Sequence, residues 1–159
     1  MSRSSVEPSM NVVLVAPEIP QNTGNIGRLC LAAGARLHLV EPLGFELGEK
    51  QLRRAGLDYW QHVDTRIWPS FAQLRQDADV RAGFWFFTTK AKRAYWDVDY
   101  ARGDYLVFGR ETKGLPESML AENAASCVTI PMQETVRSIN LATSAGIAAY
   151  EALRQISRG

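Results

Sequence analysis

Five short apolar runs constrain the fold of this chain more than any other feature. They consist mainly of aliphatic and aromatic residues and cover residues 11–16, 37–41, 84–89, 105–108 and 126–130. Helix-length segments lie between them, one of which ends at Gly34, with others at residues 48–56, 69–77 and 116–123. Continuous apolar strands that alternate with helices indicate a parallel sheet covered on both faces. We therefore predict an α/β fold with a mostly parallel sheet.

The length and composition indicate how the chain is divided. A chain of 159 residues with 46% hydrophobic content is sufficient for one core, so we assign residues 10–159 to a single domain. Residues 1–9 are polar and contain a proline, which predicts a disordered leader.

The last predicted helix covers residues 138–155, with Ser138 as its N-cap. Alanine recurs along it, which allows another helix to approach closely and leads to the hypothesis of a homodimer interface. An ordinary helix covering the sheet is the alternative, because alanine is also the best helix former.

The charge and the cysteines exclude several classes of protein. A net charge of +1 argues against a uniformly basic surface, so any basic site must be a local patch. Two cysteines without paired spacing and two distant histidines predict a reduced protein without a metal site. The chain has neither an apolar run long enough to span a bilayer nor a signal sequence, which predicts a cytoplasmic location without membrane contact.

The first candidate site is the loop that follows the apolar run 105–108. Gly109 and Gly114 bracket Glu111, so the backbone can adopt unusual dihedral angles and another group can approach it closely. Pro116 is then expected to open a helix. An ordinary strand-to-helix turn would explain the glycines and the proline equally well when this loop is taken alone.

The second candidate site follows the first strand. Asn22, Asn25 and Arg28 recur every third residue, which predicts two amides and a guanidinium on one helix face near its amino terminus. Such a cluster suits phosphate and ribose oxygens. The alternative is helix capping by an asparagine, with Arg28 in solvent.

The third candidate site follows the last strand. Ile130, Pro131 and Met132 end that strand, and a polar loop then leads to Ser138 and Asn140. Ligands of open α/β sheets bind beyond the carboxyl ends of the strands, which is where this segment is expected to lie. The sequence lacks the glycine-rich dinucleotide fingerprint, the P-loop and the nucleophile elbow. These absences argue against a dinucleotide-dependent oxidoreductase, a P-loop NTPase and an α/β hydrolase.

Taken together, the three segments resemble the SPOUT superfamily of RNA methyltransferases. The match runs from Met10 to the carboxyl terminus and rests on Asn22-x-x-Asn25-x-x-Arg28, on residues 108–116, and on residues 130–132 with Ser138-x-Asn140. Within this superfamily, the chain is similar to the minimal tRNA (cytidine(34)-2'-O)-methyltransferases. The similarity rests on the lack of an added RNA-binding domain and on residues 17–20 and 52–59. Ala142 departs from the family, which often has a serine there.

The resemblance implies a fold, a reaction and a site. It implies a C-terminal trefoil knot and transfer of a methyl group from S-adenosyl-L-methionine to the ribose 2'-hydroxyl of nucleotide 34, cytidine or a modified uridine, in leucine tRNAs. The implied cofactor-binding residues are Phe87, Gly109, Ile130 and Ser138. The implied catalytic group consists of Arg28, Asn22, Glu111 and Asn140. Arg28 is expected to position a phosphate and polarise the hydroxyl, since a guanidinium is too basic to act as the proton acceptor.

Recognition of a tRNA anticodon stem-loop requires cations and stacking surfaces. Two basic clusters near aromatic residues are candidates for RNA binding. One consists of Lys50, Arg53 and Arg54, and the other of Lys90, Lys92 and Arg93. Tyr150, which is expected to reach across a homodimer, is the last candidate. Each cluster could equally be a solvated surface. Two other functions remain open, namely methylation of another tRNA position or of rRNA, and a non-catalytic RNA-binding module.

Overall fold

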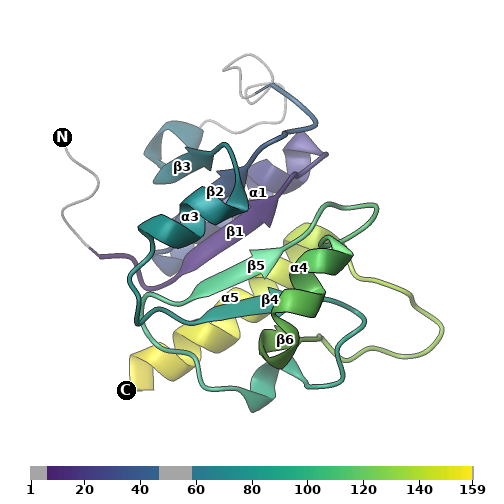
Figure 1. The fold of residues 1–159 in the computed structure, drawn as a ribbon. Helices are drawn as coiled ribbons and strands as arrows, with labels where there is room; N and C mark the ends of the chain where they lie inside the picture. The colour runs from purple at the N-terminus through teal and green to yellow at the C-terminus, as the bar shows by residue number, and fades with distance from the viewer. Residues whose placement is uncertain (1–6, 47–58, 159) are drawn as a thin grey trace.

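A six-stranded parallel sheet forms the centre of the protein (Figure 1). The computed structural model describes residues 7–46 and 59–158. The strands are β1 (Asn11–Val15), β2 (Arg36–Val40), β3 (Thr65–Trp68), β4 (Phe84–Phe87), β5 (Tyr105–Phe108) and β6 (Cys127–Val128). Their order across the sheet is β3-β2-β1-β5-β4-β6, and every neighbouring pair is parallel. All carboxyl ends of the strands therefore lie at one edge.

Helices cover both faces of this sheet (Figure 1). The α-helices are α1 (Pro20–Ala33), α3 (Phe71–Asp77), α4 (Glu117–Glu122) and α5 (Leu141–Arg158), and the short 3-10 helices are η2 (Trp60–His62), η3 (Tyr95–Asp97) and η4 (Ala124–Ser126). Helices α1 and α5 pack over one core cluster, while α3 and α4 cover the other. Among the described helices, none is long and apolar enough to cross a membrane.

The predicted α/β architecture is confirmed, with one strand missed. The five apolar runs all contain strands of the sheet, although the last pairs only over Cys127–Val128. The missed strand is β3, whose sequence Thr-Arg-Ile-Trp is short and half polar because it lies at the edge of the sheet. The helix predicted at residues 48–56 lies outside the described residues.

The prediction for the start of the last helix is wrong. Helix α5 begins at Leu141, and the acceptor at its amino end is Asn140, whose Oδ1 accepts a hydrogen bond from the backbone N–H of Thr143 at 3.2 Å. Ser138 instead lies in the preceding loop and is exposed. Asparagine and serine are comparable caps, so the sequence alone did not separate the two positions. Likewise Pro116 is the N-cap of α4, which starts at Glu117.

The alanines of α5 serve the packing of the protomer. Ala145, Ala148, Ala149 and Ala152 are each at most 1% exposed and belong to the core cluster under α1 and α5. Their small side chains let α5 lie close to the sheet and to α1. They are therefore not available as a surface for a second subunit, and the argument for a dimer from these alanines is wrong.

The described residues of the predicted leader include one that belongs to the folded domain. Ser9 is 6% exposed, and its hydroxyl donates to the carbonyl of Ala33 at 2.7 Å. Its backbone N–H donates to the carbonyl of Gly34 at 2.8 Å. These bonds attach Ser9 to the carboxyl end of α1, where carbonyl groups lack partners within the helix.

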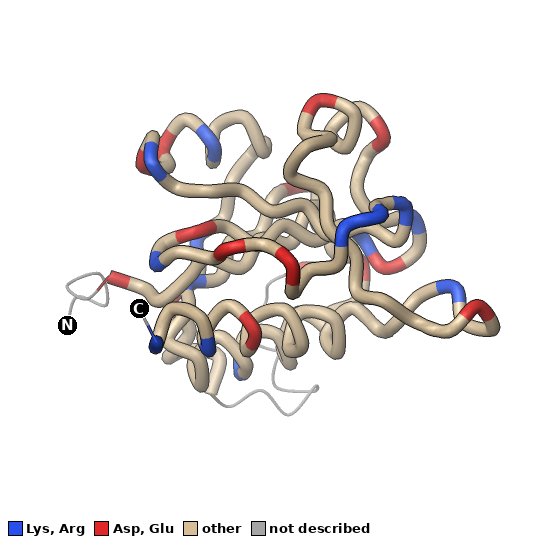
Figure 2. The backbone as a smooth tube through the Cα atoms, turned by 90° about the horizontal axis from the view of Figure 1, so that it is seen from below, with Lys and Arg blue, Asp and Glu red and all other residues tan. Residues whose placement is uncertain are grey.

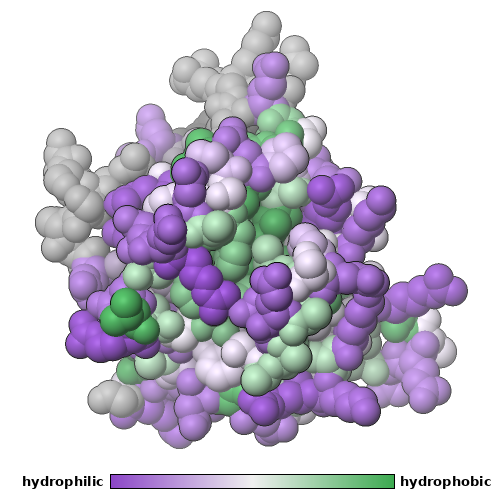
Figure 3. Space-filling model, viewed as in Figure 1, coloured by the Kyte–Doolittle hydropathy of each residue, from purple (hydrophilic) through white to green (hydrophobic). Residues whose placement is uncertain are grey.

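The face covered by α3 and α4 leaves apolar side chains partly open between the two helices. Figure 3 shows apolar side chains in the middle of this face, framed by hydrophilic ones. Arg75 of α3 lies over this region, with its guanidinium carbon 4.6 Å from the ring centroid of Phe84 and 5.7 Å from that of Phe86. The same guanidinium donates to Oδ1 of Asn123 at 2.8 Å. Arg75 thus joins α3 to the end of α4 across two rings.

We expect Arg75→Ala to lower the free energy of unfolding by about 1 to 1.5 kcal/mol, because a cation over aromatic rings and the aliphatic stem beneath it are both lost. Arg75→Lys should retain part of this stability. Urea unfolding followed by circular dichroism measures the change, with the exposed Arg102→Ala as a control. Equal midpoints for the Arg75→Ala and Arg102→Ala proteins would contradict this role.

His38 is a buried histidine held as the neutral ring. It is 3% exposed, and its Nδ1 accepts a hydrogen bond from Nε1 of Trp68 at 3.0 Å. Its Nε2 lies 2.8 Å from Oδ1 of Asn11, whose own amide nitrogen donates to the carbonyl of Gly103. Nε2 therefore carries the proton and donates it, since Oδ1 can only accept. Protonation of Nδ1 would break the bond from Trp68.

We expect the stability of the protein to fall in mild acid through His38. Burial, followed by the charges of Arg36 and Arg66, lowers the pKa of His38 from 6.5 to about 3. Between these values the unfolded chain binds a proton that the folded protein does not, so stability decreases as pH falls below 6.5. At pH 5 this loss is about 2 kcal/mol relative to pH 8. Urea unfolding at both pH values measures it.

His38→Gln should remove most of this pH dependence, whereas His62→Gln at an exposed position should preserve it. An unchanged slope of stability against pH in the His38→Gln protein would assign the acid sensitivity to other groups.

Candidate active site at the carboxyl ends of the strands

The loop that leaves β5 folds tightly back on itself. A Cβ atom added to Gly109 would lie 2.0 Å from the carbonyl carbon of Gly114 and 2.1 Å from the nitrogen of Leu115. Gly114 itself has a φ of +69°, and its N–H donates to the carbonyl of Arg110 at 2.9 Å. The close approach expected at Gly109 is thus made by the backbone of the same loop. Gly109 therefore has a steric role that an ordinary turn would not require, whereas Gly114 supplies the left-handed conformation that many turns use.

Glu111, at the tip of this loop, caps the amino end of α1. Its Oε1 accepts from the N–H of Glu18 at 2.7 Å, and its Oε2 accepts from the N–H of Ile19 at 2.9 Å and from Nδ2 of Asn22 at 3.1 Å. Helix α1 needs such an acceptor, because its N-cap residue Ile19 has an apolar side chain and its first turn holds no acidic residue. A carboxylate also stabilises the positive end of a helix.

Glu18, which precedes α1, in turn accepts hydrogen bonds from the loop after β5. Its Oε1 accepts from the N–H of Thr112 at 3.0 Å and from the Thr112 hydroxyl at 2.8 Å. These hydrogen bonds hold the pKa of the Glu18 carboxyl below its ordinary value of 4.5. Sequence reasoning missed this contact, because the two residues are 94 positions apart and neither belongs to a recognisable spacing. The loop after β5 and the segment before α1 are therefore fastened by two carboxylates.

Asn22 extends this network to α5. Its Oδ1 accepts a hydrogen bond from Nδ2 of Asn140 at 3.3 Å, while its own Nδ2 bonds Glu111. Because Asn140 also caps α5, one chain of hydrogen bonds connects the amino ends of two helices with the loop after β5. The structure thus brings together three of the four residues predicted as catalytic. These three residues hydrogen-bond mainly to one another, as expected of residues that hold the site in place.

Arg28 lies apart from this network, and the predicted shared face of α1 is wrong. Asn22 is 7% exposed, whereas Asn25 and Arg28 are exposed. Each step of three residues falls about 60° short of a full turn, so two such steps separate Asn22 and Arg28 by about 120°. The guanidinium carbon of Arg28 lies 5.5 Å from the ring centroid of Tyr59, within the range of a cation–π contact. Among the described residues no carboxylate pairs with Arg28, so its donors face solvent.

Tyr59 and Trp60 pack against α1 at its two glycines. The hydroxyl of Tyr59 donates to the carbonyl of Gly24 at 3.1 Å. A Cβ atom on Gly27 would come within 2.6 Å of the Trp60 ring. Both aromatic residues are therefore partly buried against α1.

A cavity of about 420 Å³ lies between the loops at this edge of the sheet. All four residues predicted to bind the methyl donor line it: Phe87, Gly109, Ile130 and Ser138. Phe87 stacks on Phe108 with ring centroids 4.6 Å apart, which makes a flat apolar wall at the ends of β4 and β5. Each of the three strand ends thus contributes to one cavity, as parallel strands permit.

The predicted RNA-binding residues fall into three groups. Lys50, Arg53 and Arg54 lie outside the described residues. Lys90, Lys92 and Arg93 line a second cavity beside the first, where Nζ of Lys90 pairs with Glu117 at 3.1 Å. Tyr150 of α5 is 46% exposed. Figure 2 shows basic and acidic positions spread along the backbone, which agrees with the expectation that the surface is not uniformly basic.

Loops at the carboxyl ends of the strands surround a cavity beside the capped amino ends of α1 and α5, which is the region where open α/β proteins bind ligands. A sequence model described as the SpoU rRNA Methylase family matches residues 9–150, and the chain belongs to this family. The resemblance seen in the three sequence segments is therefore confirmed.

Individual relatives extend over nearly the whole chain. The chain is 49% identical to the tRNA (cytidine(34)-2'-O)-methyltransferase of Saccharophagus degradans, which covers 92% of this chain and 95% of that protein. A solved structure that concerns 2-OH methylation of C/U34 on tRNA matches with a TM-score of 0.88 at 45% identity, covering 94% of this chain and 97% of the other. The AdoMet-bound rRNA methyltransferase from Sinorhizobium meliloti matches with a TM-score of 0.81 at 26% identity, covering 94% and 57%.

Proposed function

We propose that this protein methylates the ribose 2'-hydroxyl of nucleotide 34 in leucine tRNAs, with S-adenosyl-L-methionine as the methyl donor. The observation that carries the proposal is that residues from two of the three sequence segments line one cavity, while Asn22 of the remaining segment bonds Glu111 in its lining, in a chain 49% identical to a relative named for this reaction. A tRNA substrate implies a cytoplasmic location. The trefoil knot of the SPOUT superfamily is part of the same proposal.

The residues around the cavity fit S-adenosyl-L-methionine. Its volume of about 420 Å³ lies within the range of ligand sites, about 300 to 1,000 Å³. The ring of Phe87 and the side chain of Ile130 suit the flat, apolar adenine, while Gly109 and Ser138 offer backbone groups and a hydroxyl for its polar edges. When bound, the cofactor supplies a methyl group carried on a sulfonium. The residues that would hold it are therefore Phe87, Gly109, Ile130 and Ser138.

The chain's own residues have two tasks in this reaction. Arg28 presents unpaired guanidinium donors that suit a phosphate and the ribose hydroxyl, and it acts as a donor because a guanidinium keeps its protons. Glu111, Asn22 and Asn140 are positioning residues that fix the amino ends of α1 and α5 beside the cavity. Correct placement of the reacting groups can supply a large part of the rate acceleration.

A homodimer completes this site. Arg28 is absent from the described residues that line the cavity, and in our proposal a second copy brings it there. The layer of α1 and α5 exposes large apolar side chains that a second copy would cover, namely Ile19 at 43% and Leu31 at 39%. Tyr150 would then reach the RNA bound to the partner.

Complementation tests the shared site. Arg28→Ala and Ile130→Trp homodimers should each be inactive, and mixed dimers should regain activity at one of their two sites. Light scattering that gives a strict monomer, or mixtures without activity, would contradict the homodimer.

The methyl-transfer assay tests the proposed function. We expect the protein to transfer labelled methyl from S-adenosyl-L-methionine to tRNA, and mapping of 2'-O-methylation should locate the product at nucleotide 34 of leucine tRNAs. Arg28→Ala should reduce transfer at least tenfold, about 1.4 kcal/mol in transition-state stabilisation, while Arg102→Ala at the amino ends of the strands should not. Transfer of the labelled methyl group to ribosomal RNA in place of tRNA would contradict the proposal. RNA binding that does not depend on the cofactor and is not followed by methyl transfer would also contradict it.

A further inference from the structure

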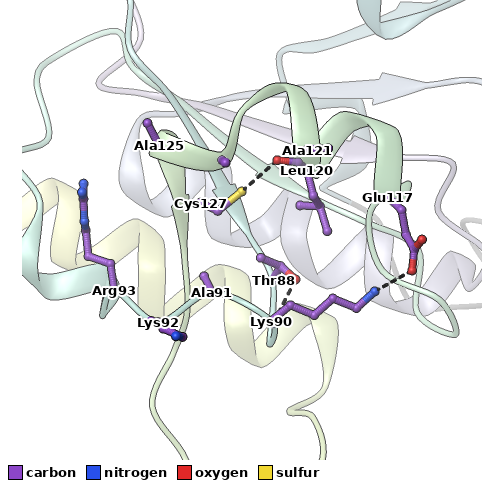
Figure 4. Close-up of a pocket in the computed structure, with 11 residues that line it drawn as sticks. Thr88, Lys90, Ala91, Lys92, Arg93, Glu117, Leu120, Ala121, Ala125 and Cys127 are labelled. Atoms are coloured by element: carbon purple, nitrogen blue, oxygen red, sulfur yellow. Dashed lines mark hydrogen bonds and ion pairs between the residues drawn. The ribbon is translucent and has the colours of Figure 1, made fainter.

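A second cavity of about 500 Å³ lies beside the candidate methyl-donor cavity (Figure 4). It is enclosed by the segment that follows β4, by α4 and by η4. Its lining residues are Thr88, Lys90, Ala91, Lys92, Arg93, Glu117, Leu120, Ala121, Ala124, Ala125 and Cys127. The three sequence segments that led to the SPOUT family do not account for this cavity.

The two sides of this cavity differ in chemistry. Figure 4 shows Ala121, Ala125 and Cys127 on one side, with the segment that carries Lys90 and Lys92 on the other. The thiol of Cys127 is directed at the backbone, 3.4 Å from the carbonyl of Asn123, so its side of the cavity is effectively apolar. One wall therefore suits a flat apolar group, and the other suits an anion.

The basic wall carries a net positive charge. Glu117 pairs with Lys90, and its carboxylate balances that one cation. In the part of the chain that the structure describes, no carboxylate pairs with Lys92 or Arg93. Two cations thus remain for an anionic partner. Trp96 lies three residues beyond Arg93 and is 53% exposed, which adds an aromatic surface next to these charges.

Backbone hydrogen bonds hold the basic wall in a fixed position next to the candidate active site. The N–H of Thr129 donates to the carbonyl of Arg93 at 2.9 Å, and the N–H of Tyr95 donates to the carbonyl of Thr129 at 2.8 Å. Thr129 directly precedes Ile130 of the methyl-donor cavity. Thr88, Lys90 and Leu120 line both cavities, so the two are adjacent. An RNA strand that brings its target ribose to the methyl donor in the first cavity can therefore place a neighbouring nucleotide in the second.

We propose that this second cavity holds one unstacked nucleotide of the RNA substrate, next in the strand to the nucleotide that is methylated. Its base lies against the wall of Ala121, Ala125 and Cys127, and its flanking phosphates contact Lys92 and Arg93. RNA is recognised mainly through such splayed bases and through its charged backbone. The inference rests on the proposed function, because it assigns the occupant from the reaction in the adjacent cavity.

The phosphate contacts are tested by measuring the affinity of the full-length protein for an anticodon stem-loop of leucine tRNA at several salt concentrations. Lys92→Ala and Arg93→Ala should each weaken binding about fivefold to tenfold and lower the slope of log K against log salt by about 1. Arg102→Ala should change neither quantity. Titration calorimetry should show unaltered binding of S-adenosyl-L-methionine to all three variants. Unchanged salt slopes in the Lys92→Ala and Arg93→Ala proteins would overturn the proposal.

The base contact is tested by filling the cavity. Ala125→Leu should weaken RNA binding without changing the salt slope, whereas Ala72→Leu on the exposed side of α3 should have no effect. Stem-loops with one abasic nucleotide at each position flanking nucleotide 34 should then identify the occupant. One abasic position should weaken binding to the wild-type protein and have no further effect on the Ala125→Leu protein.

Other outcomes separate this inference from the proposed function. Equal losses for every abasic RNA in both proteins would overturn the base contact. If a nucleoside monophosphate alone fills the cavity, so that Ala125→Leu abolishes its binding but leaves RNA affinity intact, the inference is also overturned. Wild-type protein that shows the expected binding behaviour but transfers no methyl group would contradict the proposed function alone. Transfer that is insensitive to all these variants would contradict the inference alone.

Discussion

The Gly109→Ala protein is expected to lose S-adenosyl-L-methionine binding by at least 100-fold and about 4 kcal/mol of unfolding free energy. The added methyl group would lie 2.0 Å from the carbonyl carbon of Gly114 and 2.1 Å from the nitrogen of Leu115. Both obstacles are backbone, so no side-chain rotation relieves the clash. The loop would have to open, which breaks the Gly114–Arg110 hydrogen bond and withdraws Leu115, now 5% exposed, from the core.

Gly114→Ala is the matched control within the same loop. Gly114 has a positive φ of +69° but no atom within 4 Å of an added Cβ, so alanine there should cost only the strain of the left-handed conformation, about 1 to 2 kcal/mol. Calorimetric titration with S-adenosyl-L-methionine and urea unfolding measure the two effects. Similar losses in both variants would refute the argument from close contact at Gly109.

The position of the candidate site could be predicted because strand direction constrains it strongly. Apolar runs without alternation predict parallel strands, and parallel strands place the residues after them at one edge. Gly109 follows such a run, Ile130 ends another and Phe87 ends strand β4 within a third, and all three line one cavity. Local sequence therefore predicts which distant residues lie close together, because a parallel sheet brings the residues that follow its strands to the same edge.

Features that depend on a partner distant in sequence could not be predicted. The spacing of Asn22 and Arg28 gave no sign that Glu111 and Asn140 hold Asn22 in a buried position while Arg28 faces solvent and contacts Tyr59. The alanines of α5 likewise have the same pattern whether they face a second subunit or the sheet. Periodicity defines a face of a helix, but what that face contacts is decided by tertiary packing.

Glu111→Ala should produce the second large loss, about 3 kcal/mol of stability and about 100-fold in methyl transfer. The carboxylate accepts hydrogen bonds from two backbone N–H groups at the start of α1 and from Asn22, so its removal leaves three donors without a partner. It also removes the negative charge next to the positive end of the helix. Small displacements of α1 would then misplace the residues that it carries into the site.

Glu111→Gln should restore little of this loss, although it preserves the size of the side chain. Both carboxylate oxygens accept a hydrogen bond from a backbone N–H, so either orientation of the amide sets an NH₂ group against a donor. The exposed Glu122→Gln on α4 is the control for loss of charge alone and should leave stability and transfer unchanged. A Glu111→Gln protein with wild-type stability would show that α1 does not depend on this cap.

A double-mutant cycle distinguishes positioning through the network from a general loss of stability. Glu111 and Asn140 both bond Asn22, one to its Nδ2 and the other to its Oδ1. If Asn22 couples them, the losses of Glu111→Gln and Asn140→Ala in the rate of transfer should be less than additive, because the first change already releases Asn22. Glu122→Gln and Asn140→Ala should add without interaction. Strict additivity in the first pair would mean that the amino ends of α1 and α5 are fixed independently, each by its own cap.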